Sequence, residues 1–90
     1  MTYRIERVVI EQDHVILRIS GRITGADANV LRALLEEEET AAAIDLKDIS
    51  LVDREVVKLL AACESNGNEI RNCPLYIREW ISRERETDKG

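Results

Sequence analysis

The sequence has 90 residues, of which 44% are apolar and 34% are charged, and its formal net charge is −5. This length allows one small domain, and the composition is that of a folded globular protein rather than a disordered chain. The basic residues are scattered and offer no nucleic-acid footprint, and no run approaches the ~20 apolar residues of a membrane helix.

The N-terminal part predicts an antiparallel β-hairpin. Residues 3–10 alternate loosely between apolar and charged side chains, and residues 14–20 place three aliphatic side chains on one face. The polar turn between them is short, which favours antiparallel pairing. Gly21 and Gly25 then frame a segment in which Ile23 ends a further short strand.

A helix and a buried strand are predicted next. Thr24 and Asp27 have the spacing of a capping pair at the start of a helix. The acidic run at residues 36–39 ends this helix, and we expect a solvated, frayed end. Residues 41–46 form a short apolar run bounded by polar residues, which is typical of a central strand buried on both faces.

The C-terminal part continues the alternation of helices and strands. Asp53 is expected to cap a second helix, which Gly67 ends in a left-handed conformation. Residues 69–73 predict a short strand, and Pro74 begins a third helix, where its missing N–H does no harm. Residues 83–90 are polar and are expected to form a fraying tail.

This order of elements predicts an α/β fold. Right-handed crossovers require parallel pairing in the later half, after the antiparallel hairpin. We therefore expect a single domain over residues 1–82, with a mixed sheet of four to five strands and three helices, followed by the tail at residues 83–90.

Few residues suggest chemistry. Cys63 and Cys73 match no zinc pattern, and we expect two reduced thiols in a cytoplasmic protein, although a disulfide between them stays open. Asp45, Asp48 and Asp53 surround one predicted strand end and are candidates for a metal or small-ligand site, although Asp53 is better explained as a helix cap. We expect no catalytic residue, no bound metal and no cofactor.

Two segments resemble a known family. The hairpin ending in "LRISGRIT" and the later segment "AIDLKDISLVDREVVKLL" are similar to the STAS domain family, over about residues 3–82. That family includes bacterial anti-sigma-factor antagonists and the cytoplasmic domains of sulphate transporters. Its pattern is an aliphatic strand, a short loop with an aspartate, and a serine that accepts a phosphate at the start of the next helix. Asp45 matches the strand end and Asp53 matches the loop aspartate.

The sequence departs from the family pattern at the residue after this aspartate. Arg54 stands where the family has its phosphoacceptor serine, and Ser50 lies four residues earlier and is not the matching residue. A hydroxyl at a helix N-terminus suits phosphorylation because free N–H groups and the helix dipole stabilise the phosphate. Arg54 has the opposite charge. It is either a solvated arginine whose stem covers the sheet edge, or an interface arginine that meets an acidic group of a partner.

The resemblance implies a non-enzymatic protein-interaction module of a bacterial regulatory circuit. Its partner would be an anti-sigma factor or a histidine-kinase-like ATPase, and binding would be constitutive or controlled through the partner. The predicted partner-binding residues are Ser50, Asp53, Arg54, Glu55, Val57 and Lys58. The alternatives are a self-associating scaffold without a sigma-factor link, such as a homodimer, and the less favoured site at the three aspartates.

Overall fold

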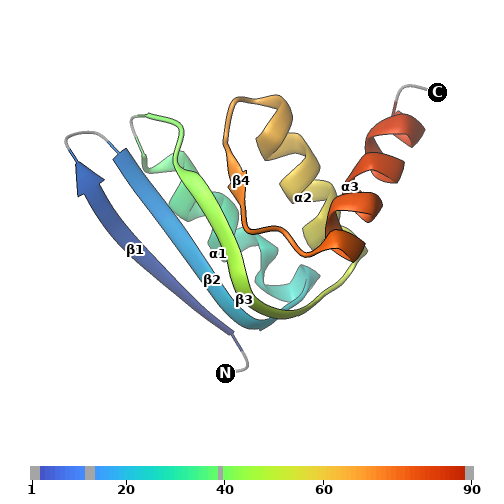
Figure 1. Cartoon of the computed structure of the whole chain (residues 1–90), viewed down its shortest axis with the longest axis horizontal. Coiled ribbons are helices and arrows are strands. Elements are labelled where there is room, and N and C mark those ends of the chain that lie inside the picture. The colour runs from blue at the N-terminus through green and yellow to red at the C-terminus, as the bar shows by residue number, and fades with distance from the viewer. Residues whose placement is uncertain (1–2, 12–13, 39, 89–90) are drawn as a thin grey trace.

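The computed structural model describes residues 3–11, 14–38 and 40–88, which form a four-stranded sheet and three helices (Figure 1). The elements are β1 (Tyr3–Glu11), β2 (His14–Ile23), α1 (Gly25–Glu36), β3 (Ala43–Val52), α2 (Arg54–Ser65), β4 (Ile70–Arg71) and α3 (Leu75–Asp88). The predicted turn between the first two strands includes residues 12–13, which lie outside the described residues.

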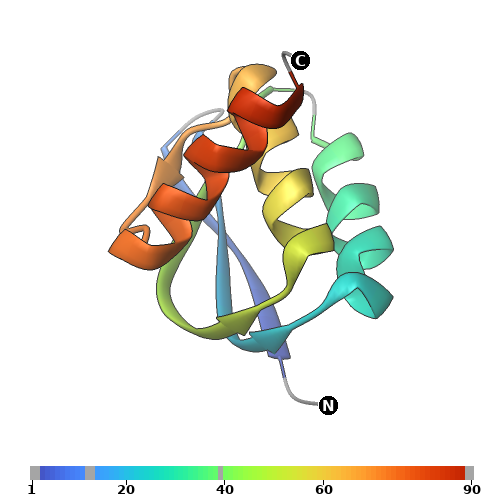
Figure 2. The ribbon, with the colours of Figure 1, turned by 90° about the vertical axis from the view of Figure 1, so that its right-hand side faces the viewer.

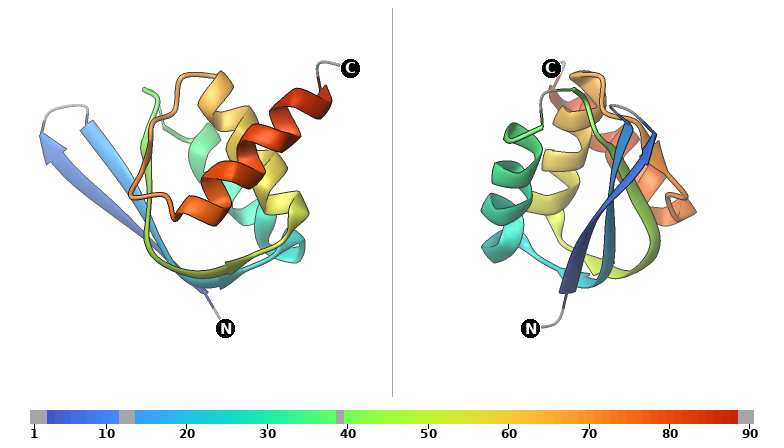
Figure 3. Two further views of the ribbon diagram at one scale, coloured as in Figure 1. Left: turned by 45° about the vertical axis from the view of Figure 1, so that its right-hand side comes forward. Right: turned by 90° about the vertical axis from the view of Figure 1, so that its left-hand side faces the viewer.

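The sheet is mixed, as predicted. Its strand order is β1-β2-β3-β4, in which β1 pairs antiparallel with β2 and the remaining pairs are parallel. The helices cover one face of the sheet, with α3 crossing over α2 (Figure 2). The opposite face, seen in the right panel of Figure 3, carries none of the described helices. The α/β class and the N-terminal antiparallel hairpin are therefore confirmed.

Several predicted strand boundaries are wrong; β4, for example, spans only Ile70–Arg71 and not residues 69–73. The segment at Gly21 is not a bend before a separate short strand, because β2 continues through it to Ile23 with Gly21 at a φ of 83°. Likewise β3 does not stop at Leu46 but continues to Val52. Irregularities in the β2–β3 register let β3 absorb extra residues, and one of them is Ser50, which has no partner in the register. Ser50 therefore lies in a strand, not in a loop.

The C-terminal segment also differs from its prediction. We expected residues 83–90 to fray, but α3 continues to Asp88, and residues 89–90 lie outside the described residues. The helix holds because Ile77 and Ile81 are fully buried and Glu84, one turn further on, is buried beside α2. A polar sequence is therefore compatible with docking when the neighbouring helix supplies partners for its charges.

The core lies between the sheet and the helices and is built mainly from aliphatic side chains. Helix α2 contributes most to it among the helices, with six buried residues. Leu60 is fully buried, whereas Trp80 of α3 is only partly buried against the core. Burial of this kind is the main favourable term in folding and fixes where the exposed start of α2 is presented.

The end of α1 is tied to the first strand by an ion pair. Arg7 donates from Nε to Oε2 of Glu38 at 2.7 Å and from Nη2 to Oε1 at 3.1 Å. Part of the acidic run is therefore paired rather than merely solvated; residue 39 lies outside the described residues. The hydrogen bond from Arg7, assisted by its charge, holds the pKa of Glu38 below its ordinary value.

A pH titration tests this pair. Because the folded pKa of Glu38 is lowered, the pair stabilises the fold above the ordinary glutamate pKa, and this contribution is lost as the pH falls through the lowered value. We expect Arg7→Gln to return the pKa of Glu38 to the ordinary range, as followed by NMR of the carboxyl carbon. Titration of Glu38 at the same pH in both proteins would show that the pair does not form.

Candidate functional site

The start of α2 is organised by the carboxylate of Asp53. Its Oδ1 accepts a hydrogen bond from the backbone N–H of Val56 at 3.1 Å, which confirms Asp53 as the helix cap. Its Oδ2 accepts from the backbone N–H of Gly25 at 2.7 Å. One carboxylate therefore satisfies donors at the starts of both α1 and α2 and holds the two helix N-termini together.

The first turns of these helices approach each other closely. A Cβ added at Gly25 would lie 2.9 Å from Cβ of Glu55, so only glycine fits here without movement. Thr24 caps α1 as predicted, and Oδ2 of Asp27 accepts from its backbone N–H at 3.4 Å. The position of the start of α2 is thus fixed by the hydrogen bond from the Gly25 backbone to the Asp53 carboxylate and by the close approach of Glu55 to Gly25.

Removing the Asp53 carboxylate tests this organisation. We expect Asp53→Ala to lower the free energy of unfolding by about 0.5–2 kcal/mol, because the cap of α2 is lost. The loss should fall at the upper end of that range, since the Gly25 N–H also loses its acceptor. Urea denaturation measures it, with Asp48→Ala, an exposed position, as the control. Equal stability of the two variants would contradict the bridging role.

Arg54 is the first residue of α2 and reaches across to α3. Its Nε donates to Oε1 of Glu84 at 2.8 Å. The side chain of Arg54 is 60% exposed, whereas that of Glu84 is only 8% exposed. The guanidinium is therefore neither a freely solvated group nor an internal one. It is oriented by a buried carboxylate and remains accessible from outside the molecule.

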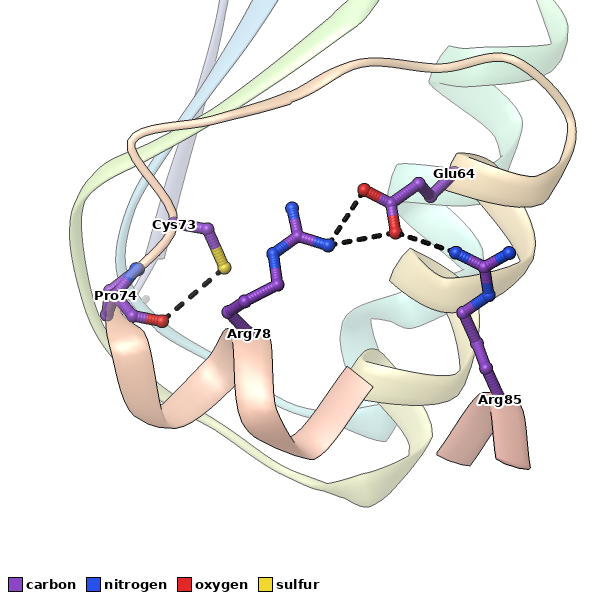
Figure 4. A network of polar contacts seen from close by, with 5 residues as sticks. All are labelled: Glu64, Cys73, Pro74, Arg78 and Arg85. Carbon is purple, nitrogen blue, oxygen red and sulfur yellow. Dashed lines mark hydrogen bonds and ion pairs between the residues drawn. The ribbon is translucent and has the colours of Figure 1, made fainter. Parts of the chain in front are cut away.

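A second ionic cluster joins the C-terminal end of α2 to α3 (Figure 4). Nη1 of Arg78 lies 2.9 and 2.8 Å from the two carboxylate oxygens of Glu64, and Nη1 of Arg85 lies 3.1 Å from Oε1. With the Arg54–Glu84 pair, these contacts attach α3 to both ends of α2. Charge-assisted contacts of this kind add orientation to the apolar packing between the helices.

The predicted partner-binding residues differ in their exposure to solvent. Ser50, Arg54, Glu55 and Lys58 are exposed, and Asp53 is half-buried in its capping role. The prediction for Val57 is wrong, because this side chain is fully buried in the core and no partner can contact it. The helical period explains the error: positions 56 and 57 both face inward, so that only positions 54, 55 and 58 of the first turns face outward.

The three aspartates do not form a site. Asp45 is buried within β3, where its Oδ1 accepts from the Lys47 backbone N–H at 2.9 Å and from Nδ2 of Asn72 at 3.2 Å. Asp53 follows the other end of the same strand. Because β3 is longer than predicted, it separates the two carboxylates, and the described residues contain no group of acids, cysteines and histidines placed to hold a metal ion.

Both cysteines are free thiols in sheltered positions. Cys63 is buried in α2, and burial raises the pKa of its thiol, partly opposed by the charge of Arg32. Burial also raises the pKa of Cys73, which lies beside Pro74 (Figure 4), while Arg78 opposes this shift. Thiols with raised pKa are poor nucleophiles at neutral pH, so neither has the character of a reactive cysteine.

The groove between α1 and α2 was not predicted from the sequence. Two exposed residues of the predicted site, Glu55 and Lys58, line it on the α2 side. Arg32 and Glu36 line it from α1, and neither was predicted. The spacing of four residues places Arg32 and Glu36 on one face of α1, and this spacing can be seen in the sequence. No local pattern in the sequence shows that this face lies beside α2.

The comparisons with known proteins identify a fold. The sequence matches no protein-family model and no curated protein. The structure is similar to the crystal structure of an anti-sigma-factor antagonist, a STAS domain from Rhodobacter sphaeroides, with a TM-score of 0.58 and 18% sequence identity. The similarity covers 78% of this chain and 84% of that chain. The chain therefore has the fold of a STAS domain, as the resemblance in the sequence predicted.

Among the residues that the structure describes, no helix combines the length and the apolar character needed to cross a bilayer.

Proposed function

We propose that the chain is a non-enzymatic protein-interaction module of the anti-sigma-factor antagonist type, which binds its partner without a phosphorylation switch. One observation carries the proposal: Arg54, accessible at the start of α2, is held in place by the buried Glu84. The similar Rhodobacter sphaeroides structure, an anti-sigma-factor antagonist, supports the functional class. The binding surface consists of the exposed residues Ser50, Arg54, Glu55 and Lys58, and Asp53 caps the helix that carries the last three.

The charge of Arg54 determines how such a surface works. A phosphate at a helix start would add negative charge that the helix dipole and free N–H groups stabilise. An arginine supplies a permanent positive charge and has no hydroxyl for a serine or threonine kinase to phosphorylate. Its orientation by Glu84 lowers the entropy lost when it binds, because the side chain is already restrained. Binding is therefore constitutive or controlled through the partner.

The chemistry of the surface indicates the kind of partner. Arg54 suits an acidic group, which a planar guanidinium binds through two parallel hydrogen bonds when the geometry allows. An anti-sigma factor or a histidine-kinase-like ATPase of a bacterial cytoplasm, acting in the regulation of transcription, is the partner class we propose. The approach of such a partner would be steered by charge and would weaken at high salt.

Partner capture followed by affinity measurement tests the proposal. The protein is used as bait in lysate of its native cell, and the partner is identified by mass spectrometry and purified. We expect Arg54→Gln/Glu84→Gln to weaken its affinity about tenfold or more, as expected for loss of a buried interfacial charge contact. The paired substitution is needed because Arg54→Glu would place a second carboxylate beside Glu84 and disturb the fold.

Two controls separate charge from folding. Glu84→Gln alone keeps the cation, and its affinity should stay close to that of the wild type. Arg4→Gln removes a cation from a position whose side chain is 78% exposed on β1. The proposal would be contradicted by a partner that binds all of these variants equally, or by a captured partner that is a substrate turned over by the protein.

A second candidate function is self-association, which one observation favours. Val9 and Ile10, near the end of the edge strand β1, are 56% and 55% exposed. An edge strand with exposed apolar side chains is a typical site of pairing between chains. If this function holds, the mass in solution measured by light scattering should rise with concentration, and Val9→Lys should abolish the rise; a monomer at every concentration would exclude it.

A further inference from the structure

The groove between α1 and α2 is walled by two helices that begin at the same level. The hydrogen bond from Gly25 to Asp53 joins their first residues, and both helices run away from that point in the same direction (Figure 2). Charged and amide side chains make up most of its lining, and the apolar side chains among them include Leu35, which is half-buried, and Leu59, which is buried. Two helices with apolar side chains in the groove between them can accept a third helix by ordinary side-chain interdigitation.

The charges along this groove have a defined order. The helices rise ~1.5 Å per residue from their paired starts. Among the charged residues that line the groove, Glu55 is therefore nearest the starts and Glu36 is farthest from them. Lys58 of α2 and Arg32 of α1 lie between them, within about one turn of each other in level. All four side chains belong to exposed residues. From the helix starts onward, the groove therefore carries a negative charge from Glu55, then positive charges from Lys58 and Arg32 on its two walls, and then a negative charge from Glu36.

From this order we propose that the groove binds an amphipathic helix of a partner protein, whose contact face carries a carboxylate at its middle and a cation toward each end. The inference rests on the proposed function, since it names how the partner engages a surface that includes Glu55 and Lys58. The central carboxylate would meet Arg32 and Lys58 together, and the flanking cations would meet Glu55 and Glu36. Apolar side chains of the partner helix would cover Leu35 and Leu59.

The partner helix follows from the same spacing. A lysine, a glutamate about four residues later and a second lysine about eleven residues after the first share one helix face and match the levels of the groove charges. Like charges placed opposite each other would repel, so the order of charges, and not only the apolar face, decides which helix binds. This order distinguishes the proposal from unspecific binding to an apolar groove.

The proposal can be tested with two synthetic peptides of about 15 residues, a length at which helices become stable enough to test. The matched peptide carries Lys, Glu and Lys, in this order, on the face that contacts the groove. The permuted peptide has the same composition, with the glutamate exchanged with the first lysine. Fluorescence anisotropy measures the affinity for the full chain, and NMR of backbone amides locates the contact. We expect the matched peptide to bind about tenfold more tightly than the permuted one, with shifts along α1 and α2.

Charge reversal in the groove supplies the specificity test. Arg32→Glu/Lys58→Glu should weaken the matched peptide about tenfold or more, whereas the control Arg4→Glu/Lys47→Glu, with the same change in net charge outside the groove, should not. A peptide with lysine in place of the glutamate should regain affinity for the groove variant, which shows that the variant is folded. Equal affinities of the two peptides, absence of binding, or equal weakening in the control would overturn the inference.

The outcomes separate this inference from the proposed function. If the peptides fail while partner binding still depends on Arg54, the groove proposal is wrong and the proposed function stands. If the matched peptide binds but the captured partner ignores Arg54, the groove is a helix-binding site and the proposed role of Arg54 is wrong.

Discussion

Leu60→Ala is expected to lower the free energy of unfolding by about 2–5 kcal/mol, which is a large fraction of the stability of a domain this size. Leu60 is fully buried in the core, and α2 lies between α1 and α3 on the helix-covered face of the sheet (Figure 3, left). Truncation to alanine removes the transfer free energy of the side chain and leaves a cavity that the surrounding elements cannot close completely.

Urea denaturation of Leu60→Ala and of Lys58→Ala makes this prediction specific. Lys58 lies on the same helix but is exposed, so its truncation should change the stability by less than about 0.5 kcal/mol. If Leu60→Ala costs less than about 1 kcal/mol, α2 is not packed as the structure shows.

The second large effect concerns the asymmetry of the Arg54–Glu84 pair. Arg54→Ala should cost about 1–3 kcal/mol, because it leaves the buried Glu84 carboxylate without its guanidinium partner. Glu84→Gln should cost less, since a neutral amide is cheaper to bury and its oxygen still accepts from Arg54. Because Arg54 is exposed, the cost of Arg54→Ala should stay well below the cost of breaking a fully buried ion pair.

A double-mutant cycle measures this asymmetry directly. The free energies of unfolding of both single variants and of Arg54→Ala/Glu84→Gln give the coupling energy between the two side chains. Recovery of stability in the double variant relative to Arg54→Ala is expected. Additive effects would show that the contact contributes nothing to folding and that Glu84 does not hold Arg54 in place.

Local signals in the sequence were sufficient for most of the elements. The capping role of Asp53 and the helical period after it located α2 to the residue, because caps and periodicity act over a few neighbouring positions. The same holds for the pair Thr24 and Asp27 at α1. The order of elements predicted the mixed sheet, and the resemblance to STAS domains named the fold, which the structural similarity at 18% identity confirms.

Contacts between distant segments were not predictable from these signals. Arg54 and Glu84 are 30 positions apart, and Gly25 and Asp53 are 28 apart, so no local pattern joins them. The bulge at Ser50 likewise depends on pairing between β3 and β2. Polarity alone suggested a frayed tail after residue 82, whereas burial of Glu84 against α2 requires knowing which helix lies beside it.

The proposed function requires a binding surface that carries a permanent cation and is not switched by phosphorylation. The most direct measurement is the affinity of the purified partner for this protein before and after incubation with the partner and ATP, with intact mass measured on the same samples. We expect an unchanged affinity and no added phosphate at residues 50–55. Phosphate on Ser50 accompanied by release of the partner would contradict it.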